Sequence, residues 1–133
     1  MRDKKSLILI VDDDQNFHEI MGAKFESAGL VVSHASSEEE ALKKAEAETP
    51  DLILMDINMP GATGTDAALV LKQNAKTKNL RIAFLTSMQK PWPGIASAEN
   101  ETIARDLGME DFIEKTDDLD SILSQAKALL PRA

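Results

Sequence analysis

The chain has 133 residues, which suffices for one domain with one hydrophobic core. Hydrophobic residues make up 43% of it and charged residues 29%, which excludes both an intrinsically disordered chain and a membrane-spanning one. It has no cysteine, which excludes thiolate chemistry, and its net charge of -8 disfavours direct binding to nucleic acid.

The first predicted strand is the unbroken apolar run Leu7–Val11, a pattern typical of a strand covered on both faces. Three acidic residues follow it, and Asp14 is placed to cap the next helix. That helix is predicted to end at Gly29, because apolar residues recur at helical spacing up to that point. These residues are Phe17, Ile20, Met21, Phe25 and Ala28.

The second predicted strand is Val31–His34. The helix after it begins at a capping box formed by Ser37 and Glu40 and stops before Pro50.

The third predicted strand, Leu52–Met55, is again fully apolar and again ends at an acidic residue, Asp56. A proline and two glycines between residues 60 and 64 break the chain behind it, and a third helix is predicted at Thr65–Ala75.

The fourth predicted strand, Ile82–Leu85, closes on Thr86 and leads into a loop at residues 91–94 that contains two prolines and Trp92. A fourth helix is predicted to end at Gly108.

The fifth predicted strand, Phe112–Ile113, comes shortly before Lys115. The last helix keeps one apolar face up to Leu130, and Asp117 or Asp118 is placed to cap its start.

Strands that alternate with helices predict an α/β fold, a parallel sheet with helices on both faces. In such sheets ligands bind beyond the carboxyl ends of the strands. The side chains that end four of the five strands should therefore meet at one edge. They are Asp12, Asp13, Asp56, Thr86 and Lys115.

Three carboxylates at one place need a countercharge, and hard oxygen ligands suit Mg²⁺. A carboxylate beside Mg²⁺ can attack a phosphoryl group in line, which makes Asp56 the expected phosphoacceptor. Lys115 is placed to neutralise the phosphoryl oxygens, and the Thr86 hydroxyl is placed to donate to one of them.

Each of these residues also has an ordinary structural interpretation. Asp12 and Asp13 could belong to a helix-capping cluster, and Asp56 could be a turn residue. A lysine in a loop is usually solvated, and a threonine at the end of a strand is usually structural. The phosphoacceptor hypothesis rests on their convergence at one sheet edge.

The chain resembles the response-regulator receiver domains of two-component signalling, including the chemotaxis regulators, over nearly its whole length of residues 1–133. Four segments carry the resemblance. They are the acidic motif at Ile8–Asp14, the phosphoacceptor motif at Pro50–Pro60 with Gly64 behind it, the switch-threonine segment at Leu85–Ser87 and the run Gly108–Lys115 into the lysine.

The resemblance implies a flavodoxin-like doubly wound fold, with a five-stranded parallel sheet of order 2-1-3-4-5. It implies that Asp12, Asp13, Asp56 and the backbone carbonyl of Asn58 bind Mg²⁺. It also implies that Asp56 accepts a phosphoryl group from the phosphohistidine of a histidine kinase or histidine phosphotransfer protein, and that Thr86 and Phe112 act as switch residues.

The implied output is a protein-binding surface on the fourth helix, fifth strand and fifth helix. Such a domain catalyses only its own phosphorylation and dephosphorylation and is not an enzyme in the usual sense. We expect a cytoplasmic protein, because no apolar signal segment opens the chain. The low apolar content and the net charge of -8 predict that it binds neither membrane nor nucleic acid directly.

Two features depart from the family pattern. Thr116 follows Lys115 where the family usually has proline. The interval from Thr86 to Lys115 is also longer than usual by roughly seven residues, an excess beyond ordinary short connections that falls around Trp92. His18 and His34 are interpreted as surface groups away from the site.

Two rival functions share some of these sequence features. A haloacid-dehalogenase-like phosphatase would use Asp12 and Asp14 as its acidic pair, but Gln15 and Asn16 stand where that family expects glycine and threonine. A pseudo-receiver would bind partners without phosphorylation, and the complete set of acidic, threonine and lysine positions argues against it.

Overall fold

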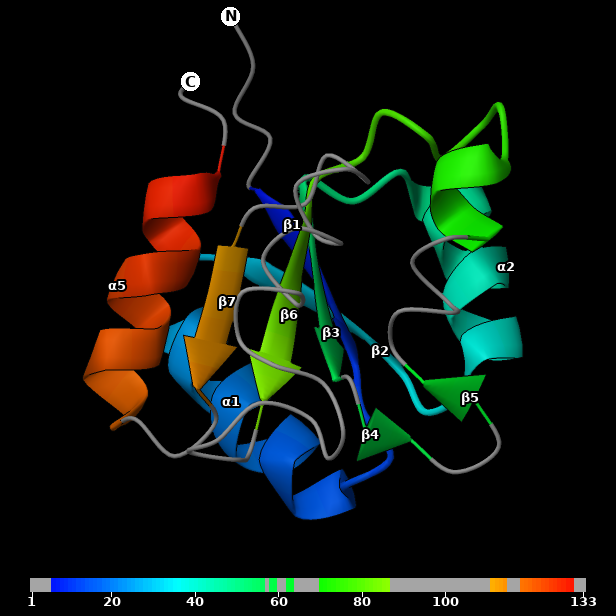
Figure 1. Cartoon of the computed structure of the whole chain (residues 1–133). Coiled ribbons are helices and arrows are strands. Elements are labelled where there is room, and N and C mark those ends of the chain that lie inside the picture. Colours follow the sequence, from blue (N-terminus) through cyan, green and yellow to red (C-terminus); the bar gives the residue numbers. More distant parts are fainter. Residues whose placement is uncertain are drawn as a thin grey trace, which may run out of the picture.

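The computed structural model describes residues 6–56, 58–59, 62–63, 70–86, 111–114 and 118–130. These residues form a parallel sheet with helices on both faces (Figure 1). The elements are β1 (Leu7–Val11), α1 (Gln15–Ser27), β2 (Val31–Ala35), α2 (Glu38–Glu48), β3 (Leu52–Asp56), β4 (Asn58–Met59), β5 (Ala62–Thr63), β6 (Ile82–Thr86), β7 (Asp111–Glu114) and α5 (Leu119–Leu129). The α/β class and the parallel sheet flanked by helices are thus confirmed.

The strands of the main sheet lie in the order β2-β1-β3-β6-β7, and every neighbouring pair is parallel. The strand order therefore reverses at β1, because β2 lies on one side of it and β3 lies on the other. In register, Ile10 faces His34 on one side and Leu54 on the other. This reversal point places the carboxyl ends of β1 and β3 next to each other, where open α/β sheets bind ligands.

Alternate residues of each buried strand pack on opposite faces of the sheet, as the pleat requires. Leu9 and Ile53 belong to the core layer under α2, whereas Ile8 and Leu54 belong to the layer under α1 and α5. Figure 1 shows α1 and α5 together on one face and α2 on the other. Both faces of the strands are buried, which explains why they read as unbroken apolar runs.

The helix ends follow the sequence signals closely. Asp14, Ser37 and Asp118 are the N-caps, and each accepts hydrogen bonds from the backbone at the start of its helix. The Glu40 carboxylate reaches back to the amide of Ser36 at 2.8 Å, one residue earlier than a standard capping box. Gly29 adopts the left-handed conformation with φ 87°, as expected of a glycine that ends a helix.

The structure corrects several details of the predicted elements. β2 extends one residue beyond the predicted Val31–His34, and β7 spans Asp111–Glu114 where Phe112–Ile113 was predicted. Asp56 and Thr86 are the last residues of β3 and β6, because each still pairs with the neighbouring strand, whereas the apolar pattern ends one residue earlier. A short antiparallel pair, β4 and β5, follows β3 and was not predicted, since two-residue strands are too short to show a periodicity.

The orientation of α1 also differs from the predicted one. Its buried residues are His18, Met21, Gly22 and Phe25. Ile20 was assigned to the apolar face but has 51% of its surface exposed, so the buried stripe runs through His18 instead.

Of the predicted third helix, the structure describes helical residues at 70–73. The predicted fourth helix and the loop that contains Trp92 lie outside the described residues. Within the described part of the chain, no helix is long and apolar enough to span a membrane.

Candidate metal and phosphoacceptor site

Three carboxylates converge at the carboxyl edge of the sheet. Val11 and Met55 are partners in register on adjacent strands. The residues that follow them, Asp12 and Asp56, therefore lie side by side. Asp13 joins them, and one carboxylate oxygen from each of the three residues lies within 4.8 Å of the other two. Asp12 and Asp56 are buried, whereas Asp13 is exposed. The structure thus brings together the three acidic residues that the sequence singled out.

Asp12 is held at several points. Its backbone amide donates to the carbonyl of Ala35 at 3.0 Å, and its Oδ1 accepts from the amide of Asp14 at 2.8 Å. Its carbonyl lies 2.7 Å from Nε2 of His18. The first two bonds fix the turn after β1, and the third ties this turn to α1. The Asp12 carboxylate therefore extends from a well-defined stretch of backbone.

The other predicted site residues are described in part. Asn58 lies in β4, two residues beyond Asp56, and its backbone pairs with Thr63. Thr86 ends β6 and is paired with Glu114 of β7. Lys115 and the side chains of Thr86 and Phe112 lie outside the described residues. Their roles stay predictions.

The donor set suits a hard divalent cation. Three carboxylate oxygens, two of them on buried residues, repel one another unless a cation or protons neutralise them. Mg²⁺ prefers oxygen ligands and usually takes few carboxylates while it keeps several waters. The exposed side of Asp13 leaves room for such waters. The residues present therefore fit a magnesium ion.

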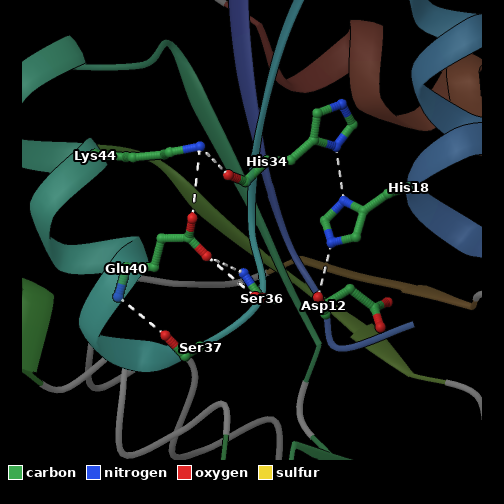
Figure 2. A network of polar contacts seen from close by, with 7 residues as sticks. All are labelled: Asp12, His18, His34, Ser36, Ser37, Glu40 and Lys44. Carbon is green, nitrogen blue, oxygen red and sulfur yellow. Dashed lines mark hydrogen bonds and ion pairs between the residues drawn. The ribbon is translucent and has the colours of Figure 1, made fainter. Parts of the chain in front are cut away.

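A polar network runs from this cluster toward α2 (Figure 2). Nδ1 of His18 lies 2.7 Å from Nδ1 of His34, and the two rings meet edge to face. The Lys44 ammonium group donates to the His34 carbonyl and forms an ion pair with Glu40. The network links α1, β2 and α2 to the backbone of Asp12.

The interpretation of His18 as a surface group away from the site is wrong, whereas His34 is partly buried and contacts His18. His18 has only 3% of its surface exposed and contacts the main chain of Asp12 directly. Burial lowers the pKa of His34 below its ordinary value, and nearby His18 and Lys44 lower it further. The spacing of His18 with Met21 and Phe25 was the available signal, since it matches one helical face.

This fold, with an acidic cluster at the carboxyl edge of a parallel sheet, defines a receiver-type α/β protein. The chain belongs to the response regulator receiver domain family, whose family model matches residues 8–127.

Similar proteins support this assignment. The chain is 32% identical to the alkaline phosphatase synthesis transcriptional regulatory protein PhoP of Bacillus subtilis, across 95% of this chain and 49% of that protein. It is 32% identical to the CAI-1 autoinducer sensor kinase/phosphatase CqsS of Vibrio cholerae, across 91% of this chain and 17% of that one. The chain thus spans about half or less of the length of these relatives.

Solved structures have the same fold. A putative response regulator from Chloroflexus aurantiacus is 30% identical and superposes with a TM-score of 0.80, across 97% of this chain and all of that one. The chemotaxis protein CheY4 of Vibrio cholerae, at 24% identity, has a TM-score of 0.83 across 96% of this chain and all of that one.

Proposed function

We propose that the chain is a phosphorylation switch in which Asp56 accepts a phosphoryl group in a Mg²⁺-dependent reaction. The observation that carries this proposal is the convergence of Asp12, Asp13 and Asp56, with one oxygen of each within 4.8 Å of the others. Membership of the receiver family supports the same function. We propose that Asp12, Asp13, Asp56 and the Asn58 carbonyl hold the metal ion.

The chemistry is an in-line transfer. An oxygen of the Asp56 carboxylate forms a bond to phosphorus, while the bond from phosphorus to the imidazole nitrogen of a phosphohistidine breaks and the imidazole takes up a proton. A bound Mg²⁺ ion would neutralise charge on the equatorial oxygens. Lys115 would contact the same oxygens, and dephosphorylation would return Asp56 by attack of water on phosphorus.

The phosphodonor is proposed to be a histidine kinase or a histidine phosphotransfer protein. Phosphorylation would draw the Thr86 hydroxyl toward a phosphoryl oxygen, because a charge-assisted hydrogen bond then becomes available. Phe112 would turn into the space that Thr86 vacates. The partner surface formed by the fourth helix, β7 and α5 would change as a result.

The haloacid-dehalogenase-like phosphatase is disfavoured by the role of Asp14. Its Oδ1 accepts hydrogen bonds from the amides of Asn16 and Phe17, as an N-cap does, at 3.0 and 3.3 Å. The third carboxylate of the cluster is that of Asp56. An acidic pair made of Asp12 and Asp14 is therefore a poor description of this edge.

Labelling by a small-molecule phosphodonor tests the function. We expect the intact mass to rise by one phosphoryl group with Mg²⁺ and to stay unchanged when the metal is chelated. Asp56→Asn should not be labelled, whereas the neighbouring Asp14→Asn should be labelled like the wild type, because asparagine also caps helices well. Equal labelling with and without chelator would contradict the proposal.

A further inference from the structure

His18 connects the acidic cluster to β2, an edge strand of the sheet. Its ring lies between two hydrogen-bonding partners, the carbonyl of Asp12 on one side and Nδ1 of His34 on the other, each at 2.7 Å. Figure 2 shows that the ring contacts the main chain of Asp12 and not its carboxylate. The ring is almost completely buried. Both of its nitrogens are therefore used in defined contacts.

These contacts determine where the ring protons lie. A backbone carbonyl can only accept, so Nε2 of His18 must carry a proton. In the neutral ring Nδ1 of His18 is then an acceptor, and the proton between the two Nδ1 atoms belongs to His34. His34 thus selects the tautomer of His18 that can donate to Asp12. This arrangement follows from geometry and from the chemistry of the imidazole ring.

His34 is itself fixed in place. It pairs with Ile10 in the sheet, and its carbonyl accepts a hydrogen bond from the Lys44 ammonium group. The carbonyl of the next residue, Ala35, accepts a hydrogen bond from the backbone amide of Asp12. The peptide groups on both sides of the Asp12 Cα are therefore anchored to β2, directly through Ala35 and through the two histidine rings.

We propose that His18 is a positioning residue for the acidic cluster, and that His34 holds it in the donor tautomer. This role rests on the proposed function, because it concerns how Asp12 is presented to Mg²⁺. His18 would touch neither the metal nor the phosphoryl group. It would fix the peptide group from which the Asp12 carboxylate extends, as outer-shell partners do for metal ligands.

The competing explanation is that His18 only stabilises the fold. Thr77 provides a matched control, since it is a buried side chain whose hydroxyl donates to the backbone carbonyl of Leu71. Thr77→Val removes the same kind of bond but lies outside the histidine network. If His18 acts on stability alone, the two substitutions should affect Mg²⁺ binding alike.

The test is a calorimetric titration with Mg²⁺ of the wild type and three variants. His18→Leu should bind Mg²⁺ about 10-fold more weakly, the lower end of the loss typical of outer-shell substitutions. His18→Gln should stay close to the wild type, because its amide nitrogen can replace Nε2 as the donor. Thr77→Val should lose stability and keep its affinity. Labelling of His18→Leu should recover when the Mg²⁺ concentration is raised.

Wild-type affinity in His18→Leu, or an equal loss in Thr77→Val, would overturn the positioning role. A wild-type chain that neither binds Mg²⁺ nor is labelled would instead overturn the proposed function, and this role with it.

A measurement on the wild type avoids substitutions that impair folding. Imidazole ¹⁵N NMR at mildly alkaline pH should find His18 protonated at Nε2 and His34 protonated at Nδ1, with coupling between the two Nδ1 nuclei. A His18 ring protonated at Nδ1 alone would contradict the inference, since such a ring cannot donate to Asp12.

Discussion

Asp12 and Asp56 end up side by side because Val11 and Met55, the residues before them, are paired in register on adjacent parallel strands. Like-charged groups held this close cost free energy until a cation is bound. We therefore expect the carboxylate cluster to lower the stability of the metal-free fold.

Mg²⁺ should consequently stabilise the fold. A ligand that binds only the folded state at about 100 times its Kd adds roughly 2.7 kcal/mol to the free energy of unfolding. We expect Asp13→Asn to gain much less stability from Mg²⁺ than the wild type does. When both proteins are free of metal, the variant should be at least as stable as the wild type. Urea unfolding with Mg²⁺ and with chelator measures both effects.

Asp14→Asn is the control for the loss of one negative charge near the cluster. It removes the carboxylate that caps α1, and the asparagine that replaces it can still cap the helix. It should respond to Mg²⁺ like the wild type. An equal response in Asp13→Asn would show that Asp13 is not a ligand.

The orientation of α1 predicts opposite outcomes for two neighbouring residues. Met21 is fully buried, whereas Ile20 is half exposed. Met21→Ala should lower the free energy of unfolding by about 2–5 kcal/mol, the range for deleting a buried side chain. Ile20→Ala should lower the free energy of unfolding by much less than Met21→Ala does. Chemical denaturation of both variants checks the prediction, and similar losses would mean that the helix is rotated.

Stability should fall in mildly acidic solution because of His34. Its pKa is lowered below 6.5 by burial and by His18 of α1 and Lys44 of α2, against the opposing effect of Glu26. As the pH falls below about 6.5, the unfolded chain takes up this proton before the folded chain does, so the free energy of unfolding decreases. The decrease ends once the pH is below the pKa of the folded state.

His34→Asn isolates this effect, since its amide can replace Nδ1 as a donor to His18 and does not titrate. Its free energy of unfolding should fall less than that of the wild type as the pH is lowered from about 8 to about 5.5. Both proteins are measured in the presence of a chelator, so that metal binding does not contribute. Identical pH dependence in the two proteins would contradict the role of His34.

Trp92 offers a probe of the proposed switch, because it is the only tryptophan and the chain has no tyrosine. We predict that a phosphoryl mimic with Mg²⁺ shifts its emission, since movement of Thr86 would pull on the loop that follows. The shift should be absent in Asp56→Asn and reduced in Thr86→Ala. Unchanged emission at full phosphorylation would make the loop a passive insertion.

Much of this architecture could be predicted from the sequence because its signals are local. Fully buried strands appear as apolar runs, and the caps at Asp14, Ser37 and Asp118 act within a few residues of themselves. The convergence of Asp12 with Asp56 also follows, since parallel strands bring their carboxyl ends to one edge.

The contacts of His18 could not be predicted in this way. Its partner His34 is 16 residues away on another element, and only the docking of α1 on the sheet brings the two rings together. A polar residue was also a poor candidate for the buried face, where Ile20 is the more hydrophobic choice. Tertiary packing outweighed hydrophobicity at this position.

The most direct test of the central claim is to locate the phosphoryl group on the chain. Borohydride reduces an aspartyl phosphate to homoserine, which survives digestion and can be identified by peptide mass spectrometry. After labelling with Mg²⁺ we predict homoserine at residue 56 and at no other aspartate. Homoserine at position 12 or 13, or a label that borohydride leaves intact, would contradict the assignment of Asp56 as the phosphoacceptor.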